Sequence, residues 1–469
     1  YLNLFKERKS QLNILKKQDP YIFKTGDKKE KKRHLGVFDL TLMSIGTIIG
    51  TGVLVLPGVV AATMAGPSEI ISFIIAGIAS ILVVLCYAEF ASSVPSEGGS
   101  YTYIYVSLGE IFAYVCGLAV VFGYVLAIGV IANGWSSYLN NILQTFGVVL
   151  PKAISTIPAN GGVVNLPAIL ITLLIVYILS LGTRESKKFN NIVVLVKISA
   201  IAIFIIVGVF YVKPGNWEVF MPFGIGGVFT GASTLFSAYT GFDITASAAE
   251  ETKNPQKTLP IALISSIVIC GIIYIVVSLI VTGIIPYNEL NKSDALAYAL
   301  TFVGQPIPAA ILSCGAVFGL LSIIFANCFG TSRILSALSR DNLLPKFLNK
   351  SNSKNVPITA LLIVGFVGAF LGGFVNLEAL AHLWTIVLLF VYSMVSISLI
   401  AFRKTNPEFK RGFKTPFVPI IPILAAACCV FLMINISLII WIYFIIFLLI
   451  AIIFYFVYSS RNSKLNKNN

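Results

Sequence analysis

Apolar runs long enough to cross a lipid bilayer follow one another along most of the 469-residue chain. A helix needs about 20 mostly apolar residues to span the hydrocarbon core. Such runs cover residues 36–61, 68–92, 110–138, 165–182, 189–211, 225–249, 258–285, 306–338, 357–376, 378–402, 416–435 and 437–459. Since 57% of the residues are hydrophobic and 11% are charged, a water-soluble fold could not bury the apolar surface. The sequence therefore predicts an all-α polytopic membrane protein with twelve transmembrane helices.

Small and polar residues interrupt two of these runs in the middle. The interruptions are residues 46–52 (GTIIGTG) and residues 237–243 (SAYTGFD). Unwound backbone inside a membrane is tolerated where it is buried in protein or lines a cavity. Many transporters bind their substrate where two helices are broken in this way. We therefore expect a transporter whose binding site consists largely of backbone groups.

The two interruptions occupy equivalent places in two halves of the chain. The five predicted spans in residues 36–212 and the five in residues 225–402 have the same layout, each opening with an interrupted helix. An odd number of spans per repeat places the second copy upside down in the membrane. We expect a five-plus-five inverted repeat, followed by two extra helices in residues 416–459. Segments 1–35 and 460–469 form the two tails.

Basic residues predict which side of the membrane each loop occupies, because short loops rich in lysine and arginine stay in the cytoplasm. Segment 1–35 contains eleven of them, and the opposite side has only Lys152, Lys213 and Lys292. The other predicted cytoplasmic loops contain Arg184, Lys187, Lys188, Lys253, Lys257, Arg333, Arg340, Lys346, Lys350, Lys354, Arg403, Lys404, Lys410, Arg411 and Lys414. Both termini are expected in the cytoplasm, in a multi-pass protein of the cell membrane.

Composition argues against several other functions. The formal net charge of +14 is explained by the basic inner loops, which face anionic lipid, so no nucleic-acid partner is expected. Segment 1–35 lacks the apolar core of a cleavable signal peptide. The seven cysteines fall in predicted helices without a CxxC pair, and two histidines cannot form a histidine metal centre. No enzyme activity and no cofactor are expected.

The first break offers groups for both ends of a zwitterion. Gly50 and Gly52 let the chain leave helical geometry, and the helix that resumes after Thr51 presents unpaired amides that suit a carboxylate. The half-helix that ends near Ile48 and Ile49 leaves carbonyls that suit an ammonium group. A glycine-rich packing seam between helices is the alternative interpretation.

The second break adds further acceptors and aromatic side chains. Carbonyls near Ser237, Ala238 and Thr240 are candidates for the remaining bonds to an ammonium group. Phe236 and Tyr239 are candidates to bound the site and exclude water, although core packing is an equally good interpretation of each.

Two ionisable residues lie inside predicted spans, where charge is costly. Asp243 follows the second break and is a candidate for proton coupling, with a structural hydrogen bond as the alternative. Lys197 lies about eight residues into the fifth span, roughly 12 Å from its cytoplasmic end at about 1.5 Å per residue. Its side chain is too short to reach the water easily. We expect Lys197 to gain and lose a proton during transport, or alternatively to tether the carbonyls of a helix break.

Several motifs resemble the amino acid–polyamine–organocation superfamily, and in particular the bacterial relatives of the cationic amino acid transporters. The similarity extends over spans one to ten. The motifs are residues 46–53 (GTIIGTGV), 56–58 (LPG), 87–91 (YAEFA), 241–243 (GFD), 249–256 (AEETKNPQ) and the segment from Arg333 to Pro345. The resemblance implies a LeuT-like fold and a secondary active transporter of amino acids that works by alternating access.

The resemblance also implies roles for individual residues. Thr51 and Gly52 match positions that hold the substrate carboxylate, and the Ile48 carbonyl matches one that accepts the ammonium group. Lys197 matches the lysine that replaces a sodium ion in proton-coupled members. At Ser237 many relatives have a bulky aromatic residue that closes over the substrate, so the outer gate of this chain differs.

The resemblance also implies that selectivity for the substrate side chain depends partly on the eighth span, where we expect Leu320 or a neighbour to face the pocket. Residues 306–332 contain no acidic residue that could pair with a cationic side chain. The predicted function is therefore import of a neutral L-amino acid, small or branched, by proton symport. The alternatives are an amino acid exchanger of the same fold and a cationic amino acid importer. The oligomeric state is not predicted.

Overall fold

The computed structural model describes residues 15–21, 35–96, 98–182, 187–246, 252–354 and 356–464, with the side chains of 187–190 left out. Most of the basic segment 1–35, the end of the predicted tail and residues 249–251 of the resemblance motif lie outside the described residues. Within the described part the chain is all-α, and its β-pairing is limited to the isolated bridges Leu35–Thr252 and Ser155–Asn165.

Helices follow one another with short connections. The first half contains α3 (Val37–Ile48), α4 (Thr51–Leu54), α5 (Leu56–Val60), the π-helical turn η1 (Ala61–Ala65), η2 (Gly66–Ser68), α6 (Glu69–Ser93), α7 (Ser100–Ser107), α8 (Glu110–Thr145), α9 (Lys152–Ser155), η3 (Pro158–Asn160), α10 (Leu166–Ser180), α11 (Lys187–Gly208), η4 (Val209–Tyr211) and η5 (Pro214–Trp217). The second half contains α12 (Gly224–Phe236), η6 (Ser237–Tyr239), α13 (Phe242–Ala246), α14 (Pro255–Ile284), η8 (Tyr287–Glu289), α15 (Ala295–Phe302), α16 (Pro306–Arg340), η9 (Lys346–Asn349), α17 (Ile358–Phe374), α18 (Leu377–Thr405), α19 (Ile420–Ile434), α20 (Leu438–Phe454), η10 (Tyr455–Ser459) and α21 (Ser460–Asn462).

Each of the twelve predicted spans contains at least one helix. In the described residues, 7 helices are long and apolar enough to cross a membrane, and four apolar helices are shorter. The chain is therefore an all-α polytopic membrane protein. The sequence analysis did not predict α7 and α15, two eight-residue helices between spans. The five-plus-five inverted repeat remains a prediction.

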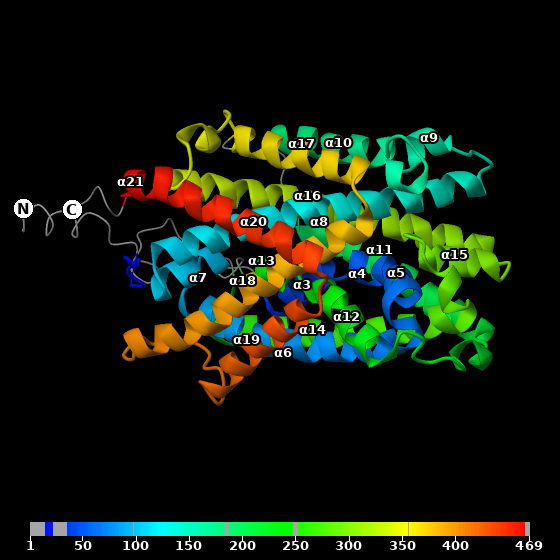
Figure 1. The fold of residues 1–469 in the computed structure, drawn as a ribbon, viewed down its shortest axis with the longest axis horizontal. Coiled ribbons are helices and arrows are strands. Elements are labelled where there is room, and N and C mark those ends of the chain that lie inside the picture. Colours follow the sequence, from blue (N-terminus) through cyan, green and yellow to red (C-terminus); the bar gives the residue numbers. More distant parts are fainter. Residues whose placement is uncertain are drawn as a thin grey trace, which may run out of the picture.

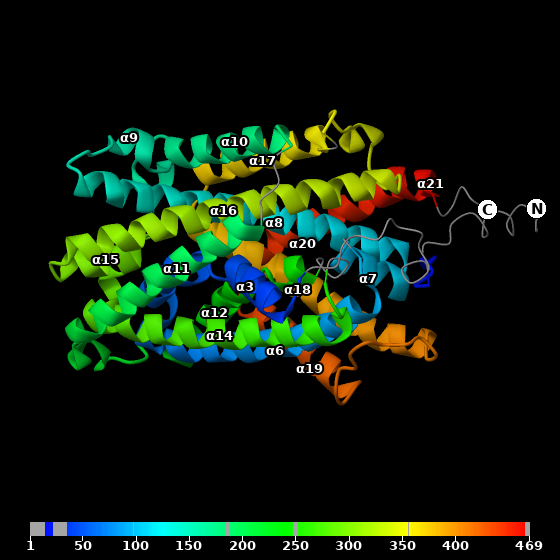
Figure 2. The same cartoon turned by 180° about the vertical axis from the view of Figure 1, so that it is seen from behind.

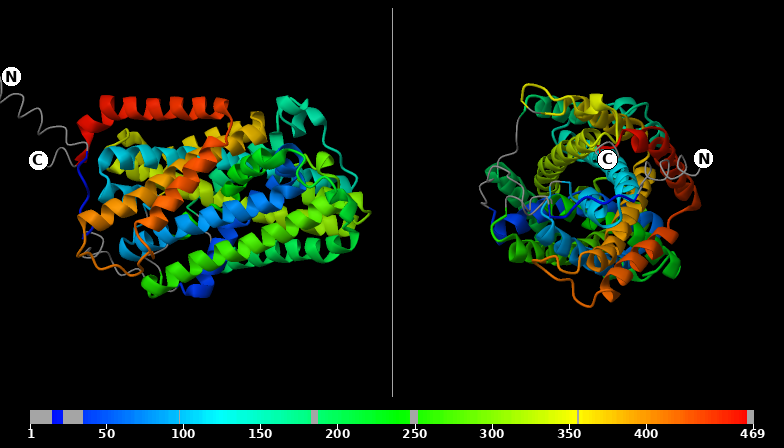
Figure 3. Two further views of the ribbon diagram at one scale, coloured as in Figure 1. Left: turned by 60° about the horizontal axis from the view of Figure 1, so that its bottom comes forward. Right: turned by 90° about the vertical axis from the view of Figure 1, so that its left-hand side faces the viewer.

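The long helices run along the longest axis of the molecule (Figure 1). The short helices α9 and α15 lie at one end of this bundle, and α7 and α21 lie at the other. Seen from behind, α3 lies near the middle between α11 and α14, which both contact it (Figure 2). Viewed along the long axis, the helices surround the middle of the bundle (Figure 3). α3 begins at the surface, where Val37 and Phe38 are exposed, and leads to a break that is buried at residues 48–52.

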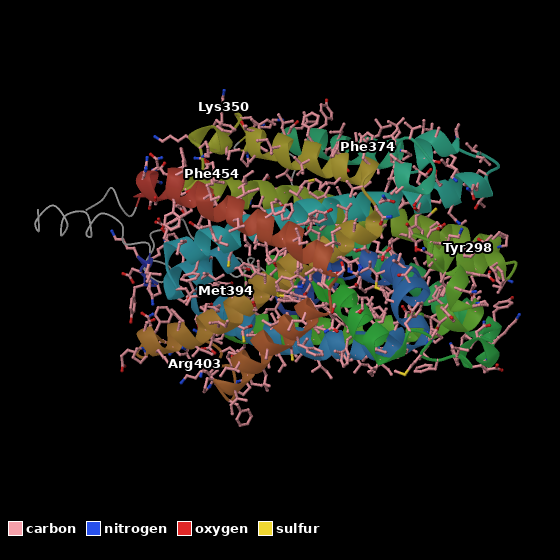
Figure 4. All side chains as sticks on the ribbon, viewed as in Figure 1. Tyr298, Lys350, Phe374, Met394, Arg403 and Phe454 are labelled. Carbon is pink, nitrogen blue, oxygen red and sulfur yellow. The ribbon has the colours of Figure 1, made fainter. Side chains whose placement is uncertain are left out.

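Both described chain ends meet at the start of α8. The Glu110 amide donates to the Lys16 carbonyl, and the Ser463 hydroxyl donates to the Glu110 carboxylate. Lys350 and Arg403 lie toward this end of the bundle, and Tyr298 lies at the opposite end (Figure 4). The two described chain ends therefore lie at the same end of the bundle, as an even number of membrane crossings requires.

Both predicted helix breaks are present. α3 ends at Ile48, Ile49 adopts an extended conformation, and the chain resumes as α4 at Thr51. The second helix passes from α12 through η6 to an extended Thr240, and α13 begins after Gly241. Gly241 has φ of +108°, a conformation that side-chain-bearing residues rarely adopt.

The two breaks touch each other at distances that only glycine permits. A Cβ added to Gly52 would lie 2.5 Å from the Ala238 Cβ, and one added to Gly241 would lie 2.9 Å from the Thr47 carbonyl oxygen. The Thr47 hydroxyl is also 3.1 Å from the Gly241 carbonyl oxygen, to which it donates. Each break therefore packs against the other through its own glycine.

A buried carboxylate holds the loop between α18 and α19 against α6. Arg403 donates two hydrogen bonds to Glu89, at 2.9 and 2.6 Å, and Arg411 pairs with the same carboxylate at 3.2 Å. The Thr415 amide donates to Glu89 at 2.7 Å. Arg403 at the end of α18 and Arg411 in the loop, which served only to predict orientation, therefore also fasten the loop to the bundle.

Changing Gly52→Ala should destabilise the protein and abolish substrate binding, because the new methyl group must force the two breaks apart. Overpacking of this kind costs about 1–3 kcal/mol. Thermal unfolding in detergent and ligand binding measure the two effects. Gly226→Ala in α12, where an added Cβ meets no atom within 4 Å, is the matched control and should leave both unchanged. A Gly52→Ala protein with wild-type stability and binding would contradict the close contact.

Changing Glu89→Gln should lower stability on the order of 3 kcal/mol, since it leaves two arginine side chains without their buried countercharge. The melting temperature in detergent should fall, and proteolysis of the loop after α18 should speed up. Glu408→Gln removes an exposed carboxylate from the same loop and serves as the control. Equal melting temperatures for the two variants would show that the Glu89 cluster does not hold the loop.

Candidate functional site

A cavity lies where the two breaks meet. It contains about 430 Å³ of empty space, a volume that includes its mouth. The lining residues are Thr47, Ile48, Gly50, Thr51, Gly52, Tyr124, Ile131, Ser237, Thr240, Gly241, Ile244, Ile323, Ala326, Asn327 and Trp384. None of these residues is acidic or basic.

The first break presents unpaired hydrogen-bond donors to this cavity. Within the described part of the chain, the amides of Gly50, Thr51 and Gly52 donate no hydrogen bond, and neither does the Thr51 hydroxyl. Buried amides are almost always paired, so this group of donors needs a partner that the protein itself does not provide. A carboxylate, which accepts several hydrogen bonds, satisfies that need.

Carbonyl oxygens of both breaks converge on one tyrosine. The Tyr274 hydroxyl lies 3.0 Å from the Ile48 carbonyl oxygen and 2.9 Å from that of Ala238. Because a hydroxyl has one proton, it donates fully to only one of them at a time, and each carbonyl has a second lone pair. The Ser237 carbonyl is occupied twice, by the amide and the hydroxyl of Thr240. Ile48 thus keeps capacity for a ligand, whereas Ser237 does not.

Lys197 is buried beside the first break, with 1% of its surface exposed. Its ammonium donates to the Gly46 carbonyl at 2.9 Å and to the Ile49 carbonyl at 2.8 Å. Its stem packs against Gly319 of α16, where a Cβ would come within 2.7 Å. The tether between Lys197 and a helix break, one of the two interpretations of the sequence, is therefore present. Proton transfer by Lys197 stays a prediction.

Asp243 lies beside the cavity but does not line it. Its carboxylate accepts hydrogen bonds from Tyr124 at 2.5 Å and from Tyr392 at 3.3 Å. Tyr124 lines the cavity, so its hydroxyl lies between Asp243 and the cavity. These bonds match the structural role considered from the sequence, and the role of Asp243 in proton coupling stays a prediction.

Several residues predicted for the site lie behind its wall. Phe236 packs edge-on against Tyr392, and the Tyr239 hydroxyl donates to a carbonyl of α6. Ile49 and Ala238 contribute the carbonyls bound by Lys197 and Tyr274. For Phe236 and Tyr239, the contacts are those of core packing.

Leu320 or a neighbour was expected to face the pocket; Leu320 itself does not line the cavity, and the lining residues of α16 follow it along the helix. Leu320 is fully buried and lies near Gly134 of α8, while Ile323, Ala326 and Asn327 line the cavity. The side chains that sequence reasoning missed also include Tyr124 of α8 and Trp384 of α18. No motif marks them, because they come from spans far from either break in the sequence.

Comparison with known proteins identifies the family of this chain. The amino acid permease family model matches residues 35–468. A methylthioribose transporter of Bacillus subtilis (strain 168) is 46% identical over 94% of this chain and 96% of that protein. The branched-chain amino acid permease BcaP of the same organism is 43% identical over 94% of this chain and 96% of its own length. The vacuolar cationic amino acid transporter 4 of Arabidopsis thaliana is 32% identical over 83% of this chain and 66% of that protein. The chain therefore belongs to the amino acid permease family, whose members are transporters rather than enzymes.

Proposed function

We propose that this protein is a secondary active transporter that imports a neutral L-amino acid. The observation that supports this most strongly is the group of unpaired amides of Gly50, Thr51 and Gly52 in an uncharged cavity. These amides and the Thr51 hydroxyl would bind the substrate carboxylate. The Ile48 carbonyl, together with that of Thr240, would accept the ammonium group. The carboxylate and the ammonium group are common to all amino acids, so the rest of the cavity wall would select the substrate by its side chain.

The cavity wall favours a neutral side chain of small or branched shape. Ile131, Ile244 and Ile323 supply apolar surface, and no lining residue is a carboxylate that could pair with a cationic side chain. A cationic side chain would therefore be desolvated without a countercharge, which is strongly unfavourable. Two relatives named branched-chain amino acid permeases, at 43% and 31% identity, support the same choice. Import of a cationic amino acid is the weaker alternative.

A second candidate substrate is methylthioribose or a similar neutral thiosugar, because the relative with that name is 46% identical to this chain. Such a molecule has neither a carboxylate nor an ammonium group. If methylthioribose bound here, the amides of the first break would have no negatively charged group to bind. We therefore rank the amino acid first, and competition between the two molecules for one site distinguishes them.

Proton coupling is proposed to depend on Lys197. In the protonated form its ammonium holds the Gly46 and Ile49 carbonyls, which fixes the end of α3. Loss of the proton would weaken both bonds and allow the first broken helix to move, as alternating access requires. One charge that crosses about 100 mV gains about 2.3 kcal/mol. At about 1.4 kcal/mol per decade, this supports roughly fifty-fold accumulation of a neutral substrate.

An exchanger of the same fold is the alternative mechanism. In an exchanger, Lys197 would stay protonated as a permanent tether, and uptake would require a counter-substrate inside. Uptake into empty vesicles driven only by a pH gradient separates the two mechanisms.

We also propose that the protein lies in the cell membrane with both termini in the cytoplasm.

Changing Thr51→Val should weaken binding of valine by about 1.5–3 kcal/mol, the value of one hydrogen bond to a charged group, or about 10- to 150-fold in Kd. The change keeps the side-chain volume and the helix break. Thermal-shift or scintillation-proximity binding to the purified protein measures it. Thr230→Val on the exposed face of α12 is the matched control and should bind like wild type. Unchanged affinity in a folded Thr51→Val protein, or tight binding of arginine with none of alanine, leucine or valine, would contradict the proposed site.

Changing Lys197→Met should abolish substrate accumulation driven by a pH gradient, because the titrating group is lost while much of its apolar stem remains. Uptake into proteoliposomes with an imposed gradient measures accumulation. Substrate binding and exchange between preloaded vesicles serve as controls for folding and should be partly retained. Concentrative uptake by Lys197→Met, or a requirement of the wild type for sodium, would show that Lys197 is not the coupling group.

A further inference from the structure

The hydroxyl groups that line the cavity are nearly all committed to partners within the protein. Thr47, Ser237 and Thr240 each donate to backbone carbonyls, and Tyr124 donates to Asp243. Their protons are therefore not free for a ligand, although their oxygens can still accept. Among the described lining residues, three side chains have polar groups without a hydrogen bond within the protein, and one of them is Thr51 of the proposed carboxylate site.

Another is Asn327. Its side chain is 4% exposed and lines the cavity from α16, on the same helix face as Ile323 and Ala326. Neither its amide nitrogen nor its carbonyl oxygen has a hydrogen-bond partner among the described residues. The indole N–H of Trp384, which lines the cavity from α18, also has none among the described residues.

An amide in this position needs a partner. Once a ligand fills the cavity, a polar group that it covers without a hydrogen bond costs free energy, and such groups are rare in folded proteins. The Asn327 side chain offers two donors and an acceptor, which suit an uncharged group that can both donate and accept. A hydroxyl group has that property, whereas an aliphatic side chain would leave Asn327 unpaired when it displaces water.

We propose that Asn327 determines specificity by hydrogen bonding to a hydroxyl group on the substrate. This inference rests on the proposed amino acid function and narrows it to neutral substrates that carry a hydroxyl near the α16 wall. Threonine fits both requirements, since it has the branched shape that the isoleucine wall favours and a hydroxyl in place of one methyl group of valine. The same chemistry could come from a sugar hydroxyl, and the experiment separates the two sources.

The test compares threonine with valine, which have nearly the same shape. Equilibrium binding of both is measured on wild type, Asn327→Leu and the control Asn435→Leu, which changes an asparagine in the turn after α19, outside the cavity. Wild type should bind threonine about tenfold more tightly than valine. Asn327→Leu should remove or invert that preference, and Asn435→Leu should keep it. Asn327→Ala serves as a second variant if the leucine does not fold.

The outcomes separate this inference from the proposed function. Equal affinities for threonine and valine in wild type, or a preference that survives in both Asn327 variants, overturn the role of Asn327 and leave the amino acid transporter intact. If wild type binds neither amino acid but binds methylthioribose, and Asn327→Leu weakens that binding about tenfold, the hydroxyl partner is a sugar. In that case the role of Asn327 stands and the amino acid proposal fails.

Discussion

The contact between the two helix breaks is the constraint on which the site depends. Gly52 lies against Ala238, and Gly241 lies against Thr47, at distances that exclude any Cβ. Because the breaks meet there, their uncoiled backbone faces a shared cavity instead of lipid. This burial inside protein is what makes interrupted helices tolerable at membrane depth. It also places amides without partners and carbonyls with spare lone pairs within one small volume.

Two side chains hold that contact in place without lining the cavity. Lys197 binds the carbonyls at the end of α3, and the Tyr274 hydroxyl bridges carbonyls of Ile48 and Ala238. Both bonds act on the same broken segment that is proposed to bind the substrate. A change of protonation at Lys197 would therefore act directly on the geometry of the substrate site. This short path is the physical basis of the proposed coupling between proton and substrate.

The two helix breaks, the helical architecture and a tether from Lys197 to the first break could be predicted from the sequence. Glycine runs and a lysine inside an apolar helix are local signals, which a single sequence contains. It did not predict which turn of α16 faces the cavity. Leu320 and Asn327 are seven residues apart on the same helix face, so the position expected from the sequence lies on the correct face but about two turns before Asn327. Tyr124 and Trp384 enter the site through contacts between distant spans, and a single sequence has no signal for such contacts.

The central claim is that the unpaired amides of the first break bind a carboxylate. The most direct test compares binding of valine with that of valinamide, which keeps the shape and the ammonium group but lacks the negative charge. Fluorescence of Trp384 or a thermal shift reports binding. The account predicts that valine binds and that valinamide binds at least about tenfold more weakly, since charge-assisted bonds to several amides are lost. Equal affinity for valine and valinamide would contradict it.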